Sequence, residues 1–341
     1  MRAARLFGPG DLRIVELPPP TPGPGQVLVK VVAYAPYGTD VGVYLNKQNR
    51  YVQAYPVGIG ADFSGVIAAV GPDVLGLEVG ERVTALALEH CGGCSNCTRG
   101  ITNLCLDPAY ATPPRQTCCE EFTLVSARKI ARIPEGVGFE DAAMLAGAVD
   151  ALNAYEKMAL TRGDDVAVVG VGAMGLSAIA AAVALGLNVV AVGGTGRRAD
   201  LAADLGARAV VRLKAHGEDV RDRALALSPG GHAAVIETTA SSWGLELAFG
   251  IAAPAACVAV TGGGALPLTS WDVVNRELRI VGVRAGHHQE QVLELIARGA
   301  LDLKPTIAAR FALDQAPEAF ALLTGPRAAD VGRVIIHCGE P

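Results

Sequence analysis

The hydrophobic pattern of the chain changes character near Asp141. Before it, apolar runs such as 26–32 and 63–70 are separated by Pro- and Gly-rich breaks, a pattern typical of β-strands and turns. After it, Ala-rich helical stretches alternate with short Val/Ile runs, which predict strands at 166–169, 189–192, 234–237, 257–261 and 279–283. Helices that alternate with buried strands indicate an α/β fold with a parallel, doubly wound sheet.

The tail mixes both patterns. It predicts a helix over 289–298 and a final strand over 332–337, with no long linker before them. The 341 residues exceed the roughly 250–300 at which one hydrophobic core stops growing, so two domains are expected.

Composition narrows the classes of function. With 51% hydrophobic and 18% charged residues, the chain buries enough apolar surface to exclude disorder. The net charge of −5, without any run of Lys or Arg, offers no electrostatic footprint for nucleic acid or an anionic membrane. We therefore expect a small-molecule substrate. Because residues 1–14 lack the apolar core of a signal peptide, the default compartment is the cytoplasm, where thiols stay reduced.

The segment 166–194 contains no charged residue and is long enough to span a bilayer. Glycines near its start and at Gly186 break it, so strand, turn, helix and strand are favoured over a transmembrane helix. Its first part runs from a strand into G-x-G-x-x-G, whose glycines let backbone N–H groups approach a pyrophosphate at a helix N-terminus. The expected contacts with a dinucleotide are Gly170, Gly172, Ala173, Met174, Gly175 and Thr238.

The choice of dinucleotide is read about 20 residues further on, where NAD-specific folds place Asp or Glu against the ribose. Here the residue is Gly193, followed by Thr195, Arg197 and Arg198. A hydroxyl and two guanidiniums, without a repelling carboxylate, favour NADP(H). The alternative is a solvated turn before a helix.

Four cysteines, Cys91, Cys94, Cys97 and Cys105, lie within fifteen residues. Four thiolates this close suit one closed, structural Zn(II) site, and an iron–sulfur cluster is the alternative. The adjacent Cys118 and Cys119, and Cys257 in an apolar strand, are interpreted as packing residues.

Over nearly its whole length the chain resembles the medium-chain dehydrogenase/reductase superfamily, which contains the zinc alcohol dehydrogenases and their quinone-oxidoreductase relatives. The motifs that carry the resemblance are Gly-Thr-Asp at 38–40, Asp-Phe-Ser-Gly-Val at 62–66 with Val-Gly at 70–71, the turn at 79–83, the cysteine lobe, G-x-G-x-x-G and Gly-Arg-Val at 332–334. The resemblance implies a GroES-like β domain (1–148 and 285–341) with a structural-zinc lobe at about 90–106, and a Rossmann domain at 149–284. It also implies a homodimer.

The chain departs from the family at the catalytic metal. The positions of the three expected ligands correspond to Tyr37, Ala61 and a residue at about Ala146. The position of the proton-relay histidine holds Gly42, and Asp62 stands where the family has a glutamate. Asp62 alone cannot hold Zn(II), which needs about three protein ligands in a catalytic site. The sequence therefore predicts structural zinc without catalytic zinc.

Histidines elsewhere give no clear replacement. His287 and His288 are interpreted as a solvated or cleft-lining pair in preference to metal ligands, and His216, His232 and His337 occur in surface-like contexts.

Without zinc, conjugate reduction is easier than carbonyl reduction, because an enolate spreads the developing charge. We therefore expect NADPH-dependent reduction of an activated C=C, including reductive cyclisation as a variant, with Tyr37, Thr39 and Asp62 as candidate catalytic residues. The alternative for Tyr37 is that it only fills the vacated metal position. Two other functions stay open: a carbonyl reductase or alcohol dehydrogenase, and a redox-inactive protein that binds NADPH.

Overall fold

The structure is a computed structural model that describes residues 1–47, 52, 54–85, 88–107, 117–213 and 219–340. The chain divides into two compact units. Unit 1 comprises Met1–Ala146, Gln289–Ala297 and Ile307–Pro341, and unit 2 comprises Gly147–His288 and Arg298–Thr306. The boundaries expected from the sequence, 148/149 and 284/285, lie within a few residues of two of these divisions.

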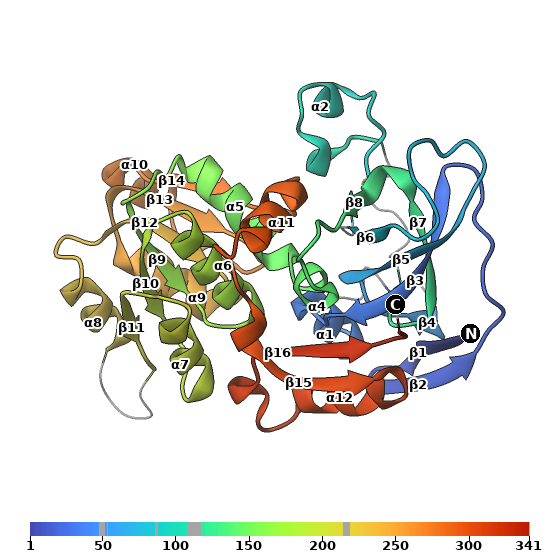
Figure 1. Ribbon diagram of the computed structural model, residues 1–341. Helices are drawn as coiled ribbons and strands as arrows, with labels where there is room; N and C mark the ends of the chain where they lie inside the picture. The colour runs from blue at the N-terminus through green and yellow to red at the C-terminus, as the bar shows by residue number, and fades with distance from the viewer. Residues whose placement is uncertain (48–51, 53, 86–87, 108–116, 214–218, 341) are drawn as a thin grey trace. The chain divides into compact units, whose positions relative to one another are not determined.

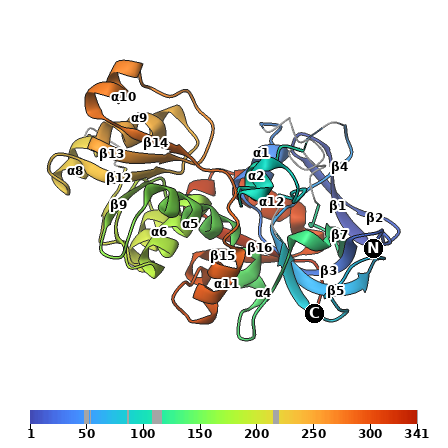
Figure 2. The same cartoon turned by 90° about the horizontal axis from the view of Figure 1, so that it is seen from above.

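Unit 1 is built on two β-sheets. A three-stranded sheet has the order β2-β1-β4, and a seven-stranded sheet has the order β15-β16-β3-β5-β6-β8, with β7 pairing with β3. The strands are β1 (Arg2–Gly8), β2 (Asp11–Glu16), β3 (Gln26–Tyr34), β4 (Val57–Gly58), β5 (Phe63–Val70), β6 (Arg82–Ala85), β7 (Phe122–Ser126), β8 (Ile130–Arg132), β15 (Ile307–Ala312) and β16 (Arg333–His337). The hairpin of β1 and β2 carries the N-terminus (Figure 2).

Both ends of the chain build this unit. Strand β16 pairs antiparallel with β3 through Ile336 and Tyr34, so the red C-terminal strands lie beside blue N-terminal ones in Figure 1. Inward-facing side chains such as Val29, Phe63 and Phe320 are fully buried. Burying a large apolar side chain contributes about 1.5–3 kcal/mol, which fixes the register of the strands.

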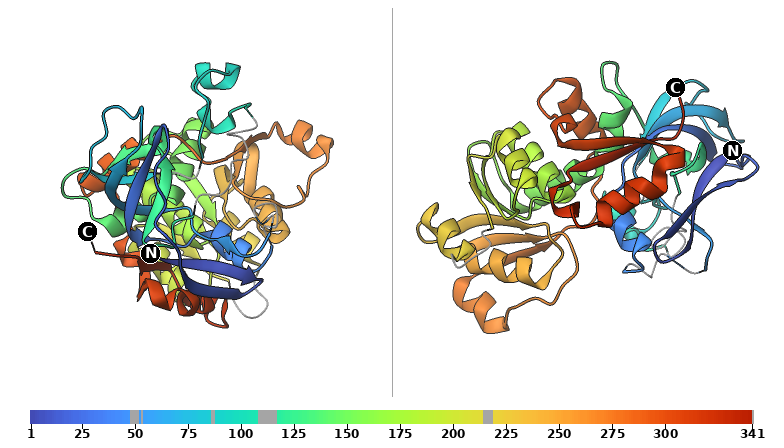
Figure 3. Two further views of the ribbon diagram at one scale, coloured as in Figure 1. Left: turned by 90° about the vertical axis from the view of Figure 1, so that its right-hand side faces the viewer. Right: turned by 90° about the horizontal axis from the view of Figure 1, so that it is seen from below.

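The helices of unit 1 are short. They are α1 (Gly38–Tyr44), α2 (Ser95–Thr98), α4 (Phe139–Ala143), α11 (Gln289–Ala297) and α12 (Ala316–Thr324). Helix α12 lies beside β15 and β16 (Figure 3). The hydrophobic pattern did not predict α1 and α4 within the β-rich region; their N-termini are fixed locally by the carboxylates of Asp40 and Asp141, which accept N–H bonds from the residues before the helices.

Unit 2 is a six-stranded, wholly parallel sheet with the order β11-β10-β9-β12-β13-β14. Its strands are β9 (Asp165–Val169), β10 (Asn188–Val192), β11 (Ala209–Val211), β12 (His232–Glu237), β13 (Ala252–Val260) and β14 (Arg279–Gly282). Five of them match the predicted strands, and β11, with three residues, was missed. The order reverses at β9, as in doubly wound dinucleotide-binding folds, which confirms the predicted fold class.

Within the described residues, six helices accompany this sheet. They are α5 (Ala146–Met158), α6 (Ala173–Ala184), α7 (Arg197–Asp204), α8 (Val220–Ala226), α9 (Ser242–Ile251) and α10 (Ser270–Arg276). The uncharged segment 166–194 forms β9, α6 and β10, the favoured interpretation of that segment. Among helices of the described residues, none is both long and apolar enough to cross a bilayer.

Candidate functional site

Glycine suits each of three positions in the turn from β9 into α6 for a different structural reason. Gly170 has φ +103°, and a Cβ there would lie 2.6 Å from Thr238 Oγ1. A Cβ on Gly175 would lie 2.0 Å from the carbonyl oxygen of Gly170, so only glycine allows α6 to approach the strand. Beside Gly172 there is open space within 4 Å. A tight turn, an open cradle and close helix packing are the features that a bound pyrophosphate requires.

Backbone donors face this cradle. Gly172 is the N-cap of α6 and supplies no side chain to bond the first N–H groups, which begin at Ala173 and Met174. The first N–H groups of a helix lack intrahelical partners and favour an anion. Thr238 donates its hydroxyl proton to the carbonyl oxygen of Val169 at 2.8 Å, so its side chain supports the turn.

After β10 the backbone again needs glycine. Gly193 has φ +133°, and a Cβ on Gly194 would lie 2.3 Å from Val171 Cγ2. Thr195 is exposed, and Arg197 begins α7 with its Nη1 atom 3.2 Å from Asp204 Oδ2. The side chains of Arg197 and Asp204 are both more than half exposed, and an ion pair this exposed contributes about 0–1 kcal/mol to stability. A phosphate can therefore displace Asp204 from Arg197 at little cost.

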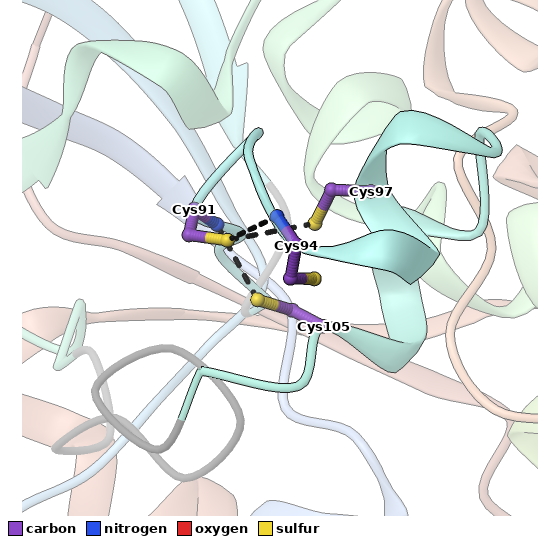
Figure 4. A group of neighbouring side chains, drawn as sticks. All are labelled: Cys91, Cys94, Cys97 and Cys105. Carbon is purple, nitrogen blue, oxygen red and sulfur yellow. Dashed lines mark hydrogen bonds between the residues drawn. The ribbon is translucent and has the colours of Figure 1, made fainter.

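The four cysteines form one group at the lobe that carries α2 (Figure 1). Their side chains point toward one another in Figure 4, and the four Sγ atoms lie within 4.8 Å of each other. Backbone N–H groups donate to these sulfurs: Cys94 N–H to Cys91 Sγ at 3.3 Å, and Leu106 N–H to Cys94 Sγ at 3.4 Å.

The electrostatics of the lobe fit a bound cation. The N–H of Leu106 is the largest cause that lowers the pKa of Cys94 to about 6. Burial raises the pKa of Cys97 to about 12, a cost that a cation would offset. Four convergent thiols with bonded sulfurs leave no position for substrate, so the residues present fit a closed Zn(II) site. Cys118, Cys119 and Cys257 are buried apart from this group.

The candidate catalytic residues lie in unit 1. Tyr37 is the N-cap of α1, and its backbone N–H donates to Asp40 Oδ2 at 2.8 Å. Asp40 is fully buried, and Asp62, just before β5, is 8% exposed. Thr39 is half-buried in the first turn of α1.

Arg333, which was not predicted as a site residue, lies beside Tyr37 and interacts electrostatically with Asp40 and Asp62. Its side chain comes from β16, is 2% exposed, and its guanidinium carbon is 5.3 Å from the centroid of the Tyr37 ring. Burial lowers the pKa of Arg333, while attraction to Tyr37, Asp62 and Asp40 opposes this change. The structure thus gathers Tyr37 and Asp62 around a buried cation, whereas no described contact brings Thr39 to it. The sequence feature that could have indicated Arg333 is a charged residue within an otherwise apolar, buried strand.

A second cation was also missed. Lys129 follows β7, and burial lowers its pKa to about 8 against the attraction of Glu89, Cys118 and Asp62. Two basic side chains therefore act on Asp62 electrostatically.

Within the described residues, two groups of side chains could hold a metal ion. One is the four cysteines and the other is Glu156 with His287 and His288. Neither includes Tyr37 or Asp62.

Two family profiles match the chain. The profile "Alcohol dehydrogenase GroES-like domain" matches residues 23–135, and "Zinc-binding dehydrogenase" matches residues 173–299. The first lies in unit 1 and the second mostly in unit 2.

Known proteins of this kind align over almost the whole chain. The sorbitol dehydrogenase of Bacillus subtilis (strain 168) is 27% identical over 326 residues, covering 94% of this chain and 92% of the relative. The L-threonine 3-dehydrogenase of Pyrococcus abyssi is 30% identical over 337 residues, covering 94% of both chains. The crystal structure of galactitol-1-phosphate dehydrogenase from Escherichia coli superposes with a TM-score of 0.88 at 25% identity, covering 99% of this chain and 100% of that one. The chain therefore belongs to the zinc alcohol dehydrogenase-like proteins of the medium-chain dehydrogenase/reductase superfamily.

Proposed function

We propose that the protein is an NADP(H)-dependent reductase that adds hydride to the activated C=C of a small enone or enoyl substrate without a catalytic zinc ion. One observation carries the proposal: a buried guanidinium, Arg333, lies among Tyr37 and Asp62, which stand at or next to the expected positions of zinc ligands. On this proposal, a cation that belongs to the chain supplies the positive charge that a metal supplies in the zinc-dependent reaction.

The geometry around Gly172 supports a bound dinucleotide, which supplies the hydride. Thr195, Arg197 and Arg198, together with Gly193 in place of an acid, support the 2′-phosphate of NADP(H). Because the ion pair between Arg197 and Asp204 is weak, the Arg197 guanidinium can bind the 2′-phosphate in place of Asp204.

The chemistry requires charge stabilisation at the substrate oxygen. When hydride reaches the β-carbon of an enone, negative charge develops on the carbonyl oxygen and the α-carbon. The Tyr37 hydroxyl donates a hydrogen bond to that oxygen, and Arg333 acts through Tyr37 as a positioning residue that keeps the local potential positive. Protonation of the α-carbon by Tyr37 or by water completes the reduction.

The cysteine lobe has a separate part in this proposal. One Zn(II) bound by Cys91, Cys94, Cys97 and Cys105 would be closed to substrate and would stabilise unit 1.

A second candidate function is favoured by the relatives. Sorbitol dehydrogenase and L-threonine 3-dehydrogenase are named for the oxidation of alcohols. On this alternative the protein is an alcohol dehydrogenase or carbonyl reductase. Tyr37 and Arg333 would then stabilise the oxygen of the carbonyl group that is itself reduced.

The test compares substrates at a known zinc content. Zinc per chain is measured first by plasma emission spectroscopy, and then cyclic enones, saturated ketones and polyols are offered with NADPH or NADP⁺. One zinc per chain and a saturated ketone formed from an enone support the proposal. An allylic alcohol product, or turnover of saturated ketones and polyols alone, supports the alternative. Nucleotide-dependent stabilisation without any turnover would indicate a redox-inactive binding protein.

The variant Tyr37→Phe sharpens this test. We expect it to lower kcat for the enone by about 10²-fold, the cost of one oxyanion donor. Tyr44→Phe is the matched control, because the Tyr44 hydroxyl donates to the carbonyl oxygen of Gly10 at 3.0 Å and belongs to the core of unit 1. If Tyr37→Phe were as active as the native protein, Tyr37 would only fill space and would have no catalytic role.

A further inference from the structure

Three potential metal ligands meet on unit 2. Glu156 lies near the end of α5, and His287 and His288 follow β14. The Nε2 atom of His288 lies 2.8 Å from Glu156 Oε2, and the two imidazole rings stack with their centroids 4.6 Å apart. One ligand atom from each of the three residues lies within 4.8 Å of the others.

The segment that carries the histidines is fixed to α5 by several contacts. Lys157 Nζ donates to the carbonyl oxygen of Gly282 at 2.9 Å, and Asn153 Nδ2 donates to that of Arg284 at 2.9 Å. A Cβ on Gly286 would lie 2.9 Å from the carbonyl oxygen of Val149, so this glycine lets the segment lie against the helix. The backbone that carries the two histidines is therefore held before any ion binds, which lowers the entropic cost of binding.

His288 shows a feature that an ordinary surface pair does not need. Its side chain is only 10% exposed, and its Nδ1 atom is buried without a hydrogen-bond partner among the described residues. The ring is therefore fixed by packing and presents Nε2 to Glu156. By contrast, His337 also pairs with a carboxylate, Glu140 Oε1 at 3.1 Å, but belongs to no described group of three ligands.

Two imidazoles and one carboxylate form a ligand set that suits borderline divalent cations of the first transition row. Tetrahedral bonds of about 2.0–2.1 Å place neighbouring ligand atoms roughly 3.3 Å apart. The ligand atoms lie within 4.8 Å of one another, and the exposed side chains of His287 and Glu156 can move to reach this spacing. An ion at this point would replace the contact between His288 Nε2 and Glu156 Oε2.

We propose that Glu156, His287 and His288 bind one Zn²⁺ or a similar divalent transition-metal ion, with water in the remaining position. His288 is the last residue of the main segment of unit 2, so the ion would join α5 to the point where the chain leaves this unit. The site stiffens that exit segment. It is independent of the proposed reaction and of the cysteine lobe.

The test uses the full chain with its cysteine-bound zinc retained. Native protein, Glu156→Gln and His287→Gln are titrated with Zn²⁺ by calorimetry, with His337→Gln as the matched control. We expect one further equivalent to bind to native protein and to the control. Loss of outer-shell partners alone weakens metal binding about 10–100-fold, so each ligand variant should weaken it at least as much.

A spectroscopic readout identifies the ligands. Cu²⁺ at this site should show hyperfine coupling to two imidazole nitrogens by electron paramagnetic resonance in native protein and to one in His287→Gln. Both substituted side chains are exposed, so unchanged melting temperatures without added metal verify folding. Absence of a further equivalent at micromolar free zinc, or native-like binding by both ligand variants, would overturn the proposal.

Discussion

The guanidinium carbon of Arg333 lies 5.3 Å from the centroid of the Tyr37 ring. A desolvated cation over an aromatic ring is stabilised by about 2 kcal/mol or more. This attraction, together with Asp40 and Asp62, offsets part of the cost of burying a charge that is 2% exposed. The pairing of β16 with β3 brings the final strand of the chain to the strand that precedes α1.

We predict that Arg333→Met lowers kcat about 10²-fold and that Arg333→Lys recovers part of the loss. The methionine keeps the approximate length of the side chain but removes the charge that stabilises negative charge near Tyr37. A nearby cation favours the ionised form of a phenol, so the pH at which activity declines on the alkaline side should rise in the methionine variant. Steady-state rates across a pH series measure both effects.

The control for this pair is Arg310→Met. Arg310 donates two hydrogen bonds to Glu140 on the surface of unit 1, at 2.7 and 2.8 Å, and has no described contact with Tyr37 or Arg333. It should leave the pH profile unchanged. A lower rate in Arg333→Met with an unshifted profile would assign Arg333 a merely structural role.

The parts of the site that sequence predicted are those encoded within a short stretch of chain. The glycine turn spans six residues from Gly170 to Gly175, and the cysteine lobe spans fifteen from Cys91 to Cys105, so spacing alone defines their local geometry. The strands of unit 2 are similarly local, because each buried Val/Ile run forms its own element.

Arg333 could not be placed in this way, because its partner Tyr37 is almost the whole chain away and only strand pairing joins them. His232 shows the same limit. Its surface-like context was misleading: it is 3% exposed, and its Nε2 atom lies 3.0 Å from the carbonyl oxygen of Ala224. His216 lies outside the described residues. Burial of a single polar side chain depends on tertiary packing, which hydrophobic periodicity does not determine.

Cys94→Ser should release the metal of the cysteine lobe and lower the melting temperature. The substitution removes one thiolate from a four-thiol site, and structural zinc contributes directly to folding free energy. Metal content and thermal unfolding measure the result. Cys257→Ser is the control, because Cys257 is buried in β13 apart from the lobe; it should keep its metal. Full zinc content in Cys94→Ser would contradict the four-cysteine site.

Replacing Arg197 and Arg198 by alanine should weaken NADPH binding at least tenfold, about 1.4 kcal/mol, while changing NADH binding less than about twofold. The two guanidiniums are expected to contact only the 2′-phosphate, which NADH lacks. Fluorescence titration with both nucleotides measures the difference. Arg208→Ala removes another exposed arginine of unit 2, 3.9 Å from Asp165, and should affect neither. Equal losses for both nucleotides would contradict selectivity for the 2′-phosphate.

Asp150 gives unit 2 a pH-dependent stability. It lies on α5, and burial raises its pKa to about 7 from a usual 3.8, although the backbone N–H of Gly286 stabilises the carboxylate. The unfolded chain therefore loses this proton at lower pH than the folded protein does. Between roughly pH 4 and 7 the folded state binds more protons, so Asp150 reduces stability as the pH rises through this range.

Asp150→Asn should therefore raise the melting temperature at about pH 8, and the gain should disappear as the pH falls toward about 4. The amide stays neutral and its oxygen can still accept the N–H of Gly286. Asp272→Asn is the control of opposite sign: hydrogen bonds from Thr269 lower the pKa of Asp272, so its carboxylate stabilises the protein above its usual pKa. That variant should melt lower at about pH 8, and most of the loss should remain at about pH 4, because Asp272 becomes protonated in the folded state only below its usual pKa of 3.8. Thermal unfolding of the native protein and both variants across this pH range measures the two trends. If Asp150→Asn raised the melting temperature equally at about pH 4 and about pH 8, the change would act by packing, with no contribution from the ionisation of Asp150.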